Sequence, residues 1–398
     1  MSVATEPLPE QFRIGMLLND TRYRTYTIQI IALIIFMLAL AFLVSNTINN
    51  LALLGKDFRF DFLWEPASYD INQRLIEYTS RSPHWKAALV GILNTLLVAV
   101  LGCITATIIG VFAGVLRLSK NWVVSRLMTF YIEGVRNVPV LLQILLWYAI
   151  FIEALPSPKL SEPSLGGAVV ATNRGFYVPS PVFYDGALVV GIVFLLSLVA
   201  IYIFRRNARL RQETTGQQLP TGWITLGLLI FPAVIAYFIM GSPIGLQYPE
   251  LKGFNYRGGL HMRNSLVALW LALSVYTGAF IAEVVRSGIQ AISHGQTEAA
   301  YALGVRPGRT MKLIILPQAL RVIIPPQISQ YLNLTKNSSL AIAVGYMDAT
   351  GTLGGITLNQ TGREMECIML LMLFYLAVSL LISFVMNIYN ERVKLVER

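Results

Sequence analysis

Charged residues are scarce in this chain. Only 13% of its 398 residues are Asp, Glu, Lys or Arg, whereas hydrophobic residues make up 55%. Because soluble globular domains carry about 25% charged residues, the composition excludes an ordinary soluble protein and indicates an integral membrane protein. The net charge is +10, but there is no polar surface over which the basic residues could spread, so no nucleic-acid partner is expected.

Cysteine, histidine and catalytic motifs are also nearly absent. Cys103 and Cys367 both lie in apolar runs, which is typical of small buried hydrophobes and not of a disulfide or a nucleophile. Three histidines without clustered carboxylates predict no metal site. The sequence has no H-E-x-x-H motif, no recognisable Ser–His motif and no G-x-x-x-x-G-K-[ST] loop. We therefore expect neither a catalytic site nor ATP hydrolysis in this chain.

Long apolar runs, by contrast, are frequent. About 20 apolar residues cross a bilayer as a helix. Eight runs come near that length: 26–46, 85–116, 126–150, 186–204, 223–240, 265–289, 324–344 and 367–389. The pattern predicts an all-α integral membrane protein with about eight transmembrane helices.

Basic residues gather at one set of run ends. They occur before the first run, between the second and third, and after the fourth, sixth and eighth. If eight helices alternate, all these positions fall on one side, which the positive-inside rule identifies as cytoplasmic. Both termini are then predicted to be cytoplasmic. The more mixed segments near 50–84, 153–185, 241–263 and 345–366 are predicted to lie on the opposite side.

One polar segment separates the sixth and seventh runs on the predicted cytoplasmic side. HGQTEAAYALGVRPGRTMKLIILPQAL (294–320) is too amphipathic for the bilayer and predicts two short helices around a turn. Thr297 and Glu298 suit a helix start, and Gly304 suits a left-handed helix end. Pro317 breaks the helical pattern before the next run. Such a hairpin either rests on its own bundle or offers a docking surface to a soluble partner.

This segment resembles the EAA loop of bacterial ABC importer permeases, which docks into a cleft on an ATPase subunit. The matching residues, at the spacing of that loop, are Glu298, Ala299, Ala300, Gly304, Ile314, Leu316 and Pro317. The resemblance implies that these residues contact an ATPase. Two helices linked in this way can pass a rigid-body movement into the membrane.

Four further stretches narrow the resemblance. They are GILNTLLVA (91–99), EGVRNVPVLLQ (133–143), AEVVRSGIQAISHGQTEAA (282–300) and TKNSSLA (335–341). Together they resemble the polar amino acid uptake permeases, most of all the Q-type permease of general L-amino-acid transporters. The resemblance implies a five-helix ABC importer permease core made of the second, third, sixth, seventh and eighth runs.

The resemblance also implies partners and a location. They are two copies of an ABC ATPase that holds ATP and Mg, a second and different permease chain, a periplasmic amino-acid-binding protein, and the lipids of the bacterial inner membrane. No cofactor is expected on this chain itself. The alternative is a stand-alone secondary amino acid transporter or channel, for which no convincing internal repeat is visible.

The expected organisation follows from the runs and the resemblance. It comprises residues 1–84 with the first span and an outer segment, 85–152 as the first part of the core, 153–262 as an insertion with two extra spans, 263–390 as the second part of the core with the docking loop 294–320, and 391–398 as a cytoplasmic tail.

Ionisable residues inside the predicted spans are costly to place in lipid. Glu133 and Arg136 are three residues apart, and Glu283 and Arg286 repeat that spacing. Each pair therefore shares one helix face. The pairs either fix helix packing or form a charged inner gate. In a closed gate, we expect Glu133 or Arg136 to meet Glu283 or Arg286.

Two other polar pairs lie within the runs. Asn94 and Thr95 either cap a backbone irregularity or touch the substrate. Lys336 and Asn337 lie in the middle of the seventh run, where such polarity needs a cavity or partner groups. Lys336 suits the carboxylate of an amino acid or an internal glutamate.

Overall fold

The computed structural model describes residues 21–53 and 58–393. Among them, seven helices are long and apolar enough to cross a membrane. They are α2 (Thr21–Leu53), α3 (His84–Arg117), α6 (Ala187–Thr215), α7 (Thr221–Ile239), α8 (Asn264–Gln290), the helix that contains α11 (Leu316–Asn337), and α13 (Glu364–Val393). A bent pair, α4 (Trp122–Arg136) and α5 (Val140–Glu153), makes eight if it counts as one span. The mainly helical, multi-span fold is confirmed.

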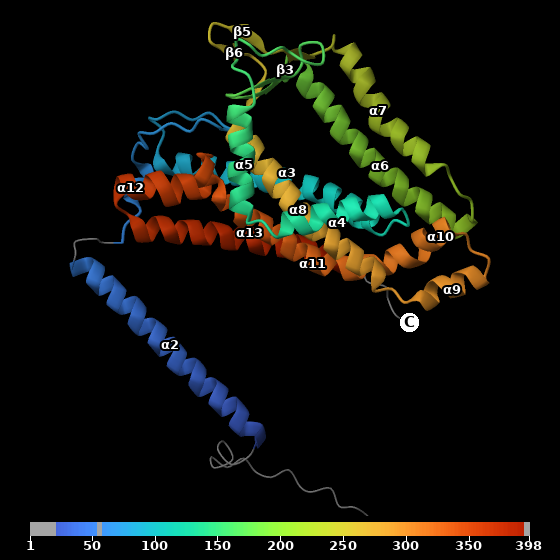
Figure 1. Cartoon of the computed structure of the whole chain (residues 1–398), viewed down its shortest axis with the longest axis horizontal. Coiled ribbons are helices and arrows are strands. Elements are labelled where there is room, and N and C mark those ends of the chain that lie inside the picture. The colour runs from blue at the N-terminus through green and yellow to red at the C-terminus, as the bar shows by residue number, and fades with distance from the viewer. Residues whose placement is uncertain (1–20, 54–57, 394–398) are drawn as a thin grey trace, which may run out of the picture.

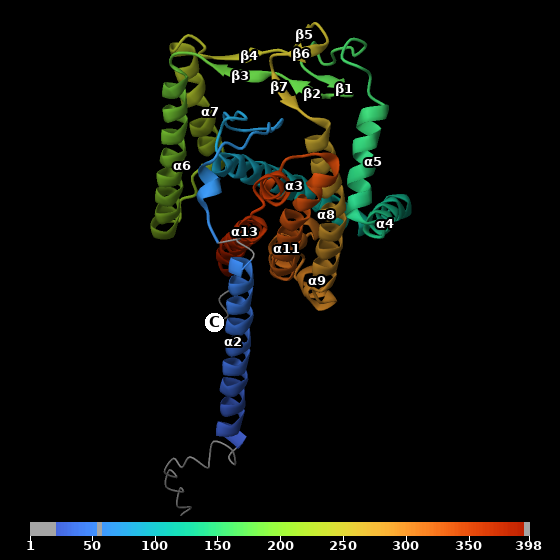
Figure 2. The same ribbon diagram turned by 90° about the vertical axis from the view of Figure 1, so that its left-hand side faces the viewer.

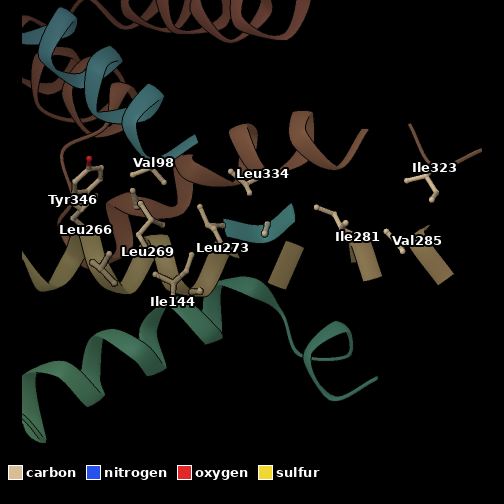
Figure 3. Close-up of a cluster of buried hydrophobic side chains, with 14 of the residues drawn as sticks. Val98, Ile144, Leu266, Leu269, Leu273, Ile281, Val285, Ile323, Leu334 and Tyr346 are labelled. Atoms are coloured by element: carbon tan, nitrogen blue, oxygen red, sulfur yellow. The ribbon is translucent and has the colours of Figure 1, made fainter. Parts of the chain in front are cut away.

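The core is built around α8, which packs against α3, α4, α5 and α11. Figure 3 shows apolar side chains of α3, α5 and α11 meeting those of α8. Labelled members of the cluster are Val98, Ile144, Leu269, Leu273 and Leu334. α13 joins this unit by packing against α11.

Small residues bring α3 and α8 close together. A Cβ on Gly110 would lie 2.5 Å from Cβ of Ile281, and one on Gly114 would lie 2.6 Å from the carbonyl oxygen of Ala282. In a membrane, small residues at helix interfaces let backbones approach, so that van der Waals contacts hold the helices together. The contact between α3 and α8 depends on these glycines.

The sequence predicted one continuous helix for the third run, but the structure divides this run into two helices. α4 and α5 meet at an angle of 103°. Pro139 directly precedes α5 as its N-cap residue and cannot continue the hydrogen-bond ladder of α4. The amide of the buried Gln143 donates to the carbonyls of Val135 (2.9 Å) and Val138 (3.0 Å), which satisfies groups that the break leaves free.

Three helices lie outside this core. None of the most apolar stretch of α2 or α7 is buried, and only 11% of that stretch of α6 is. α2 stands apart from the bundle, while α6 and α7 run antiparallel beside each other (Figures 1 and 2). These helices correspond to the first run and to the insertion.

Seven short strands add to the helical fold that the sequence predicted, all within residues 170–262. They are β1 (Val170–Thr172), β2 (Gly175–Val178), β3 (Ser180–Phe183), β4 (Ile244–Gln247), β5 (Glu250–Lys252), β6 (Asn255–Arg257) and β7 (Leu260–Met262). The antiparallel sheets are β1-β2-β7, β3-β4 and β5-β6. Because β3 precedes α6 and β4 follows α7, their pairing closes the base of the α6–α7 hairpin.

The end of the core opposite α9 is made of short segments (Figure 1). They are η1 (Asp61–Trp64), the 3₁₀-helix η3 (Ser338–Val344), the π-helix η4 (Thr350–Thr357) and α12 (Leu358–Thr361). Both η1 and η4 contact α3. The seventh run therefore ends in a compact cap and not in an open loop.

Candidate functional site

The polar segment after α8 folds as the predicted helix pair. α9 (His294–Ala302) is followed by a turn and by α10 (Pro307–Thr310). Gly304 has φ +71°, the left-handed conformation that glycine adopts without strain. The Val305 amide donates to the Ala300 carbonyl (3.0 Å) across this turn, which closes the end of α9.

The start of α9 differs from the prediction. Ser293 is extended and precedes the first helical residue, so the helix begins at His294. Thr297 and Glu298 consequently lie inside α9 and not at its start. The carboxylate of Glu298 is exposed, so it is free to meet a partner instead of the helix terminus.

The segment after the turn also continues further than predicted. α10, the π-helix η2 (Met311–Ile315) and α11 form one uninterrupted helix that leads into the bundle. Pro317 lies in the first turn of α11 and does not stop the helix there. A movement of α10 is therefore passed directly to α11.

The seven residues matched to the EAA loop divide by exposure. Glu298, Ala299, Gly304 and Leu316 are exposed, and Ile314 and Pro317 are half-buried. Ala300 is only 2% exposed, because it faces the hairpin itself. Of the alanine pair, only Ala299 is therefore open to a close-packing partner.

A charged cluster joins three helices of the core. Arg117, the last residue of α3, pairs with Glu133 of α4 (3.2 Å) and with Glu283 of α8 (2.5 Å). Glu283 also pairs with Arg286 on its own helix. The side chain of Arg117 is only 16% exposed. The two Glu-x-x-Arg pairs thus come together, but through a third residue.

Sequence reasoning treated Arg117 only as one of the basic residues that mark the cytoplasmic side. Its role depends on where α3 ends relative to α4 and α8, which a pattern within one helix does not contain. The sequence signal for this role of Arg117 is the length of the second run, which is greater than a helix needs to cross a bilayer.

Arg136 is not in the expected direct pair. Its guanidinium carbon lies 4.9 Å from the ring centroid of Phe280 on α8. A cation over an aromatic face is attracted by the ring quadrupole. In the described part of the chain its Nε has no hydrogen-bond acceptor. Arg136 thus fixes α4 against α8 through an aromatic contact.

Asn94 and Thr95 hold the compact cap at the end of the seventh run in place. The buried Asn94 amide donates to the carbonyls of Gln73 (2.7 Å) and Met347 (2.8 Å). The hydroxyl of Thr95, also buried, accepts from the Ala349 amide (3.0 Å). This geometry favours the structural alternative for both residues.

Lys336 and Asn337 are the last two residues of α11, and η3 continues the same candidate span to Val344. Lys336 is exposed. Within the described residues no carboxylate forms an ion pair with it, so the structure offers no internal glutamate partner. A role of these residues in holding a substrate carboxylate stays a prediction.

Asp348 was not singled out from the sequence. Its side chain is fully buried, and it accepts from the Gly351 amide (2.8 Å) at the start of η4. Burial raises the pKa of this carboxyl to about 6. Across the described residues no three His, Cys, Asp or Glu side chains gather as a metal site would require.

Comparison with known proteins supplies the family. The model of the family described as binding-protein-dependent transport system inner membrane component matches residues 106–394. The chain is 51% identical to the glutamate/glutamine/aspartate/asparagine transport system permease protein BztB of Rhodobacter capsulatus, with 100% of both chains covered. It is 43% identical to the general L-amino acid transport system permease protein AapQ of Rhizobium johnstonii, covering 97% of this chain and 96% of that one.

Among solved structures, the crystal structure of an amino acid ABC transporter with histidines aligns at 19% identity and a TM-score of 0.45, over 78% of this chain and 95% of that one. The family match spans more than half of the sequence, and the relatives match it almost from end to end. The chain belongs to the family of inner membrane components of binding-protein-dependent transport systems.

Proposed function

We propose that this chain is the permease subunit of an ATP-driven importer of L-amino acids in the bacterial inner membrane. The observation that carries the proposal is the exposed α9–α10 pair, which presents Glu298, Ala299 and Gly304 at the spacing of an EAA loop. Amino acids are proposed as cargo because the names of both full-length relatives specify them.

The remaining subunits follow from this role. Two copies of a separate ATPase would hold ATP and Mg, and a second, different permease chain would complete the pathway. A periplasmic binding protein would deliver the amino acid. This chain would bind no cofactor and carry out no catalysis.

The arrangement of the helices supports the proposed topology. Figure 1 places the α6–α7 turn, α9, α10 and the C-terminal end of α13 toward its lower right, and the N-terminal end of α2 is the end that points the same way. The strands lie at the opposite end of α6 and α7. This grouping agrees with cytoplasmic termini and an outer position for the strands.

The charged cluster is proposed as an inner closure that responds to the docked ATPase. α8 carries Glu283 and leads into α9 after only three residues, 291–293. A displacement of α9 would therefore shift Glu283 relative to Arg117 of α3. Separation of that pair would let the cytoplasmic ends of α3, α4 and α8 part.

The test is a charge reversal in the assembled transporter, with a matched control. Glu298→Lys places a cation at the proposed contact, whereas Glu213→Lys makes the same change at the exposed end of α6. Unfavourable charge across an interface costs several kcal/mol. We expect Glu298→Lys to lower ATPase co-purification more than about ten-fold and to abolish ATP-driven uptake in proteoliposomes. Glu213→Lys should leave both near the unmodified level.

Uptake by the chain in vesicles that lack any ATPase would instead identify a stand-alone transporter. Equal losses in Glu298→Lys and Glu213→Lys would remove the docking role of α9.

A further inference from the structure

A hollow of about 680 Å³ lies where α6 ends and α7 begins. Its lining includes Tyr202, Arg205, Arg206, Arg209, Gln212 and Gln218. Three guanidinium groups thus border one space within a single helical hairpin. Nothing in the proposed coupling to an ATPase uses them.

The three arginines lack acidic partners. Within residues 21–53 and 58–393, neither Arg205, Arg206 nor Arg209 forms an ion pair with a carboxylate. Arg211, on the same helix, hydrogen-bonds to Gln217 (3.1 Å) and does not line the hollow. Among the described residues, no ion pair therefore neutralises the concentrated positive charge at the hollow.

The position of the hollow along α6 matches the level of lipid headgroups. From Ala187 to Phe204 the helix is almost entirely apolar, and at 1.5 Å per residue these residues span about 27 Å. That is close to the roughly 30 Å of a bilayer's hydrocarbon core. Tyr202 and Trp223, which are 68% and 79% exposed, flank this level, as aromatic residues do at membrane interfaces.

We propose that the hollow binds the phosphate of an anionic phospholipid headgroup. Guanidinium groups grip phosphate oxygens with two parallel hydrogen bonds and are less costly to desolvate than ammonium groups. The negative charge of the lipid offsets part of the positive charge of the arginines, while its tails lie along the exposed apolar sides of α6 and α7. A nucleic acid or an acidic protein would not need a site at this depth.

The inference requires only that α6 and α7 cross the membrane. It does not depend on docking of an ATPase to α9, so the two proposals fail separately.

The test compares two arginines that are two residues apart. Arg209→Gln and Arg211→Gln remove the same charge from the same helix, but only Arg209 lines the hollow. The full-length chain is purified in detergent with phosphatidylglycerol or phosphatidylcholine, and bound lipids are counted by native mass spectrometry. A basic residue near an anionic surface contributes about 1 kcal/mol, or about five-fold in affinity. We expect Arg209→Gln to lower phosphatidylglycerol retention about five-fold, and Arg211→Gln to change it little.

Two further experiments identify the ligand as an anionic phospholipid. The triple variant Arg205→Gln, Arg206→Gln, Arg209→Gln should lose phosphatidylglycerol while keeping the same low retention of phosphatidylcholine. Millimolar inorganic phosphate should not displace the lipid, because it lacks the tails. The proposal is overturned by equal losses in the two single variants, by retention in the triple variant, by displacement with inorganic phosphate, or by a short RNA that outcompetes the lipid.

Discussion

The helices α8 and α2 are both suited to cross a bilayer, but they differ in how much of each is buried inside the protein. Both are long enough to cross a bilayer, but 67% of the most apolar stretch of α8 is buried inside the protein and none of that stretch of α2 is. α2 is dense in Ile, Leu and Phe, whereas the buried face of α8 contains Ser274, Thr277, Gly278 and Ala282.

The difference shows that hydrophobicity does not mark the core of this protein. Lipid tails are as apolar as leucine, so burying an apolar side chain against another helix gains little transfer free energy in a membrane. Close packing and hydrogen bonds decide instead, and they favour small and weakly polar residues. Thr105 of α3 and Ser274 of α8 share a hydrogen bond (2.5 Å) of this kind.

The largest effect is expected when one glycine is replaced in a helix of the packed core, α3, and one in a helix outside it, α6. Gly110→Leu in α3 would drive a side chain into Ile281, whereas Gly191→Leu in α6 has nothing within 4 Å of the new Cβ. Overpacking of this severity should destabilise the chain by about 3 kcal/mol or more. Thermal unfolding in detergent should show a large loss for Gly110→Leu and none for Gly191→Leu. Similar midpoints for the two variants would mean that α3 and α8 do not pack as described.

The next test concerns the charged cluster that joins α3, α4 and α8. Arg117→Ala leaves Glu283 with Arg286 alone and Glu133 without an ion-pair partner among the described residues. Because the cluster is only partly exposed, we expect a cost of about 1–3 kcal/mol, between that of surface and buried pairs. ATP hydrolysis should also continue without matching uptake. Arg126→Ala, an exposed change in α4, is the control.

A double-mutant cycle with Glu283→Gln sharpens the assignment. Residues in one ion-pair network should show a coupling energy above about 0.5 kcal/mol. Additive losses would show that Arg117 and Glu283 act independently.

A smaller effect is expected at the compact cap that follows α11. Asn94→Ala removes the donor from the carbonyls of Gln73 and Met347, and unsatisfied buried groups cost about 1–2 kcal/mol here. Hydrogen exchange should accelerate in residues 345–357 but not in α9. Asn359→Ala, which loses only an exposed bond to Gly355, should leave exchange unchanged. A uniform increase across the chain would argue against a local role for Asn94.

The smallest effect should follow removal of residues 1–57. The apolar stretch of α2 has no buried residues, so its loss should change the unfolding free energy of the remaining helices by less than about 0.5 kcal/mol. The measurement is the thermal midpoint of the truncated chain in detergent. A drop of several degrees would show that α2 packs against the bundle.

Features local in sequence were predictable, and those made by tertiary contacts were not. The apolar runs, the Gly304 turn and the importer family followed from residue types and spacing, and the structure and the comparisons confirm them. The strands were missed because segments of three or four residues show no reliable alternation. The break at Pro139 had a visible signal, but the apolar residues on both sides of it read as one span.

The 103° bend between α4 and α5 has a mechanical consequence. If α4 turned as a rigid helix about the Asn137–Pro139 junction, Glu133 would lie about 6 Å and Trp122 about 23 Å from the pivot. A rotation of about 10° would move Trp122 by about 4 Å but Glu133 by only about 1 Å. The Trp122 end of α4 is joined to α3 by residues 118–121, and the Ser125 hydroxyl donates to the Arg117 carbonyl (2.9 Å). A swing of α4 would therefore carry the end of α3 with it and displace Arg117 relative to Glu283 of α8.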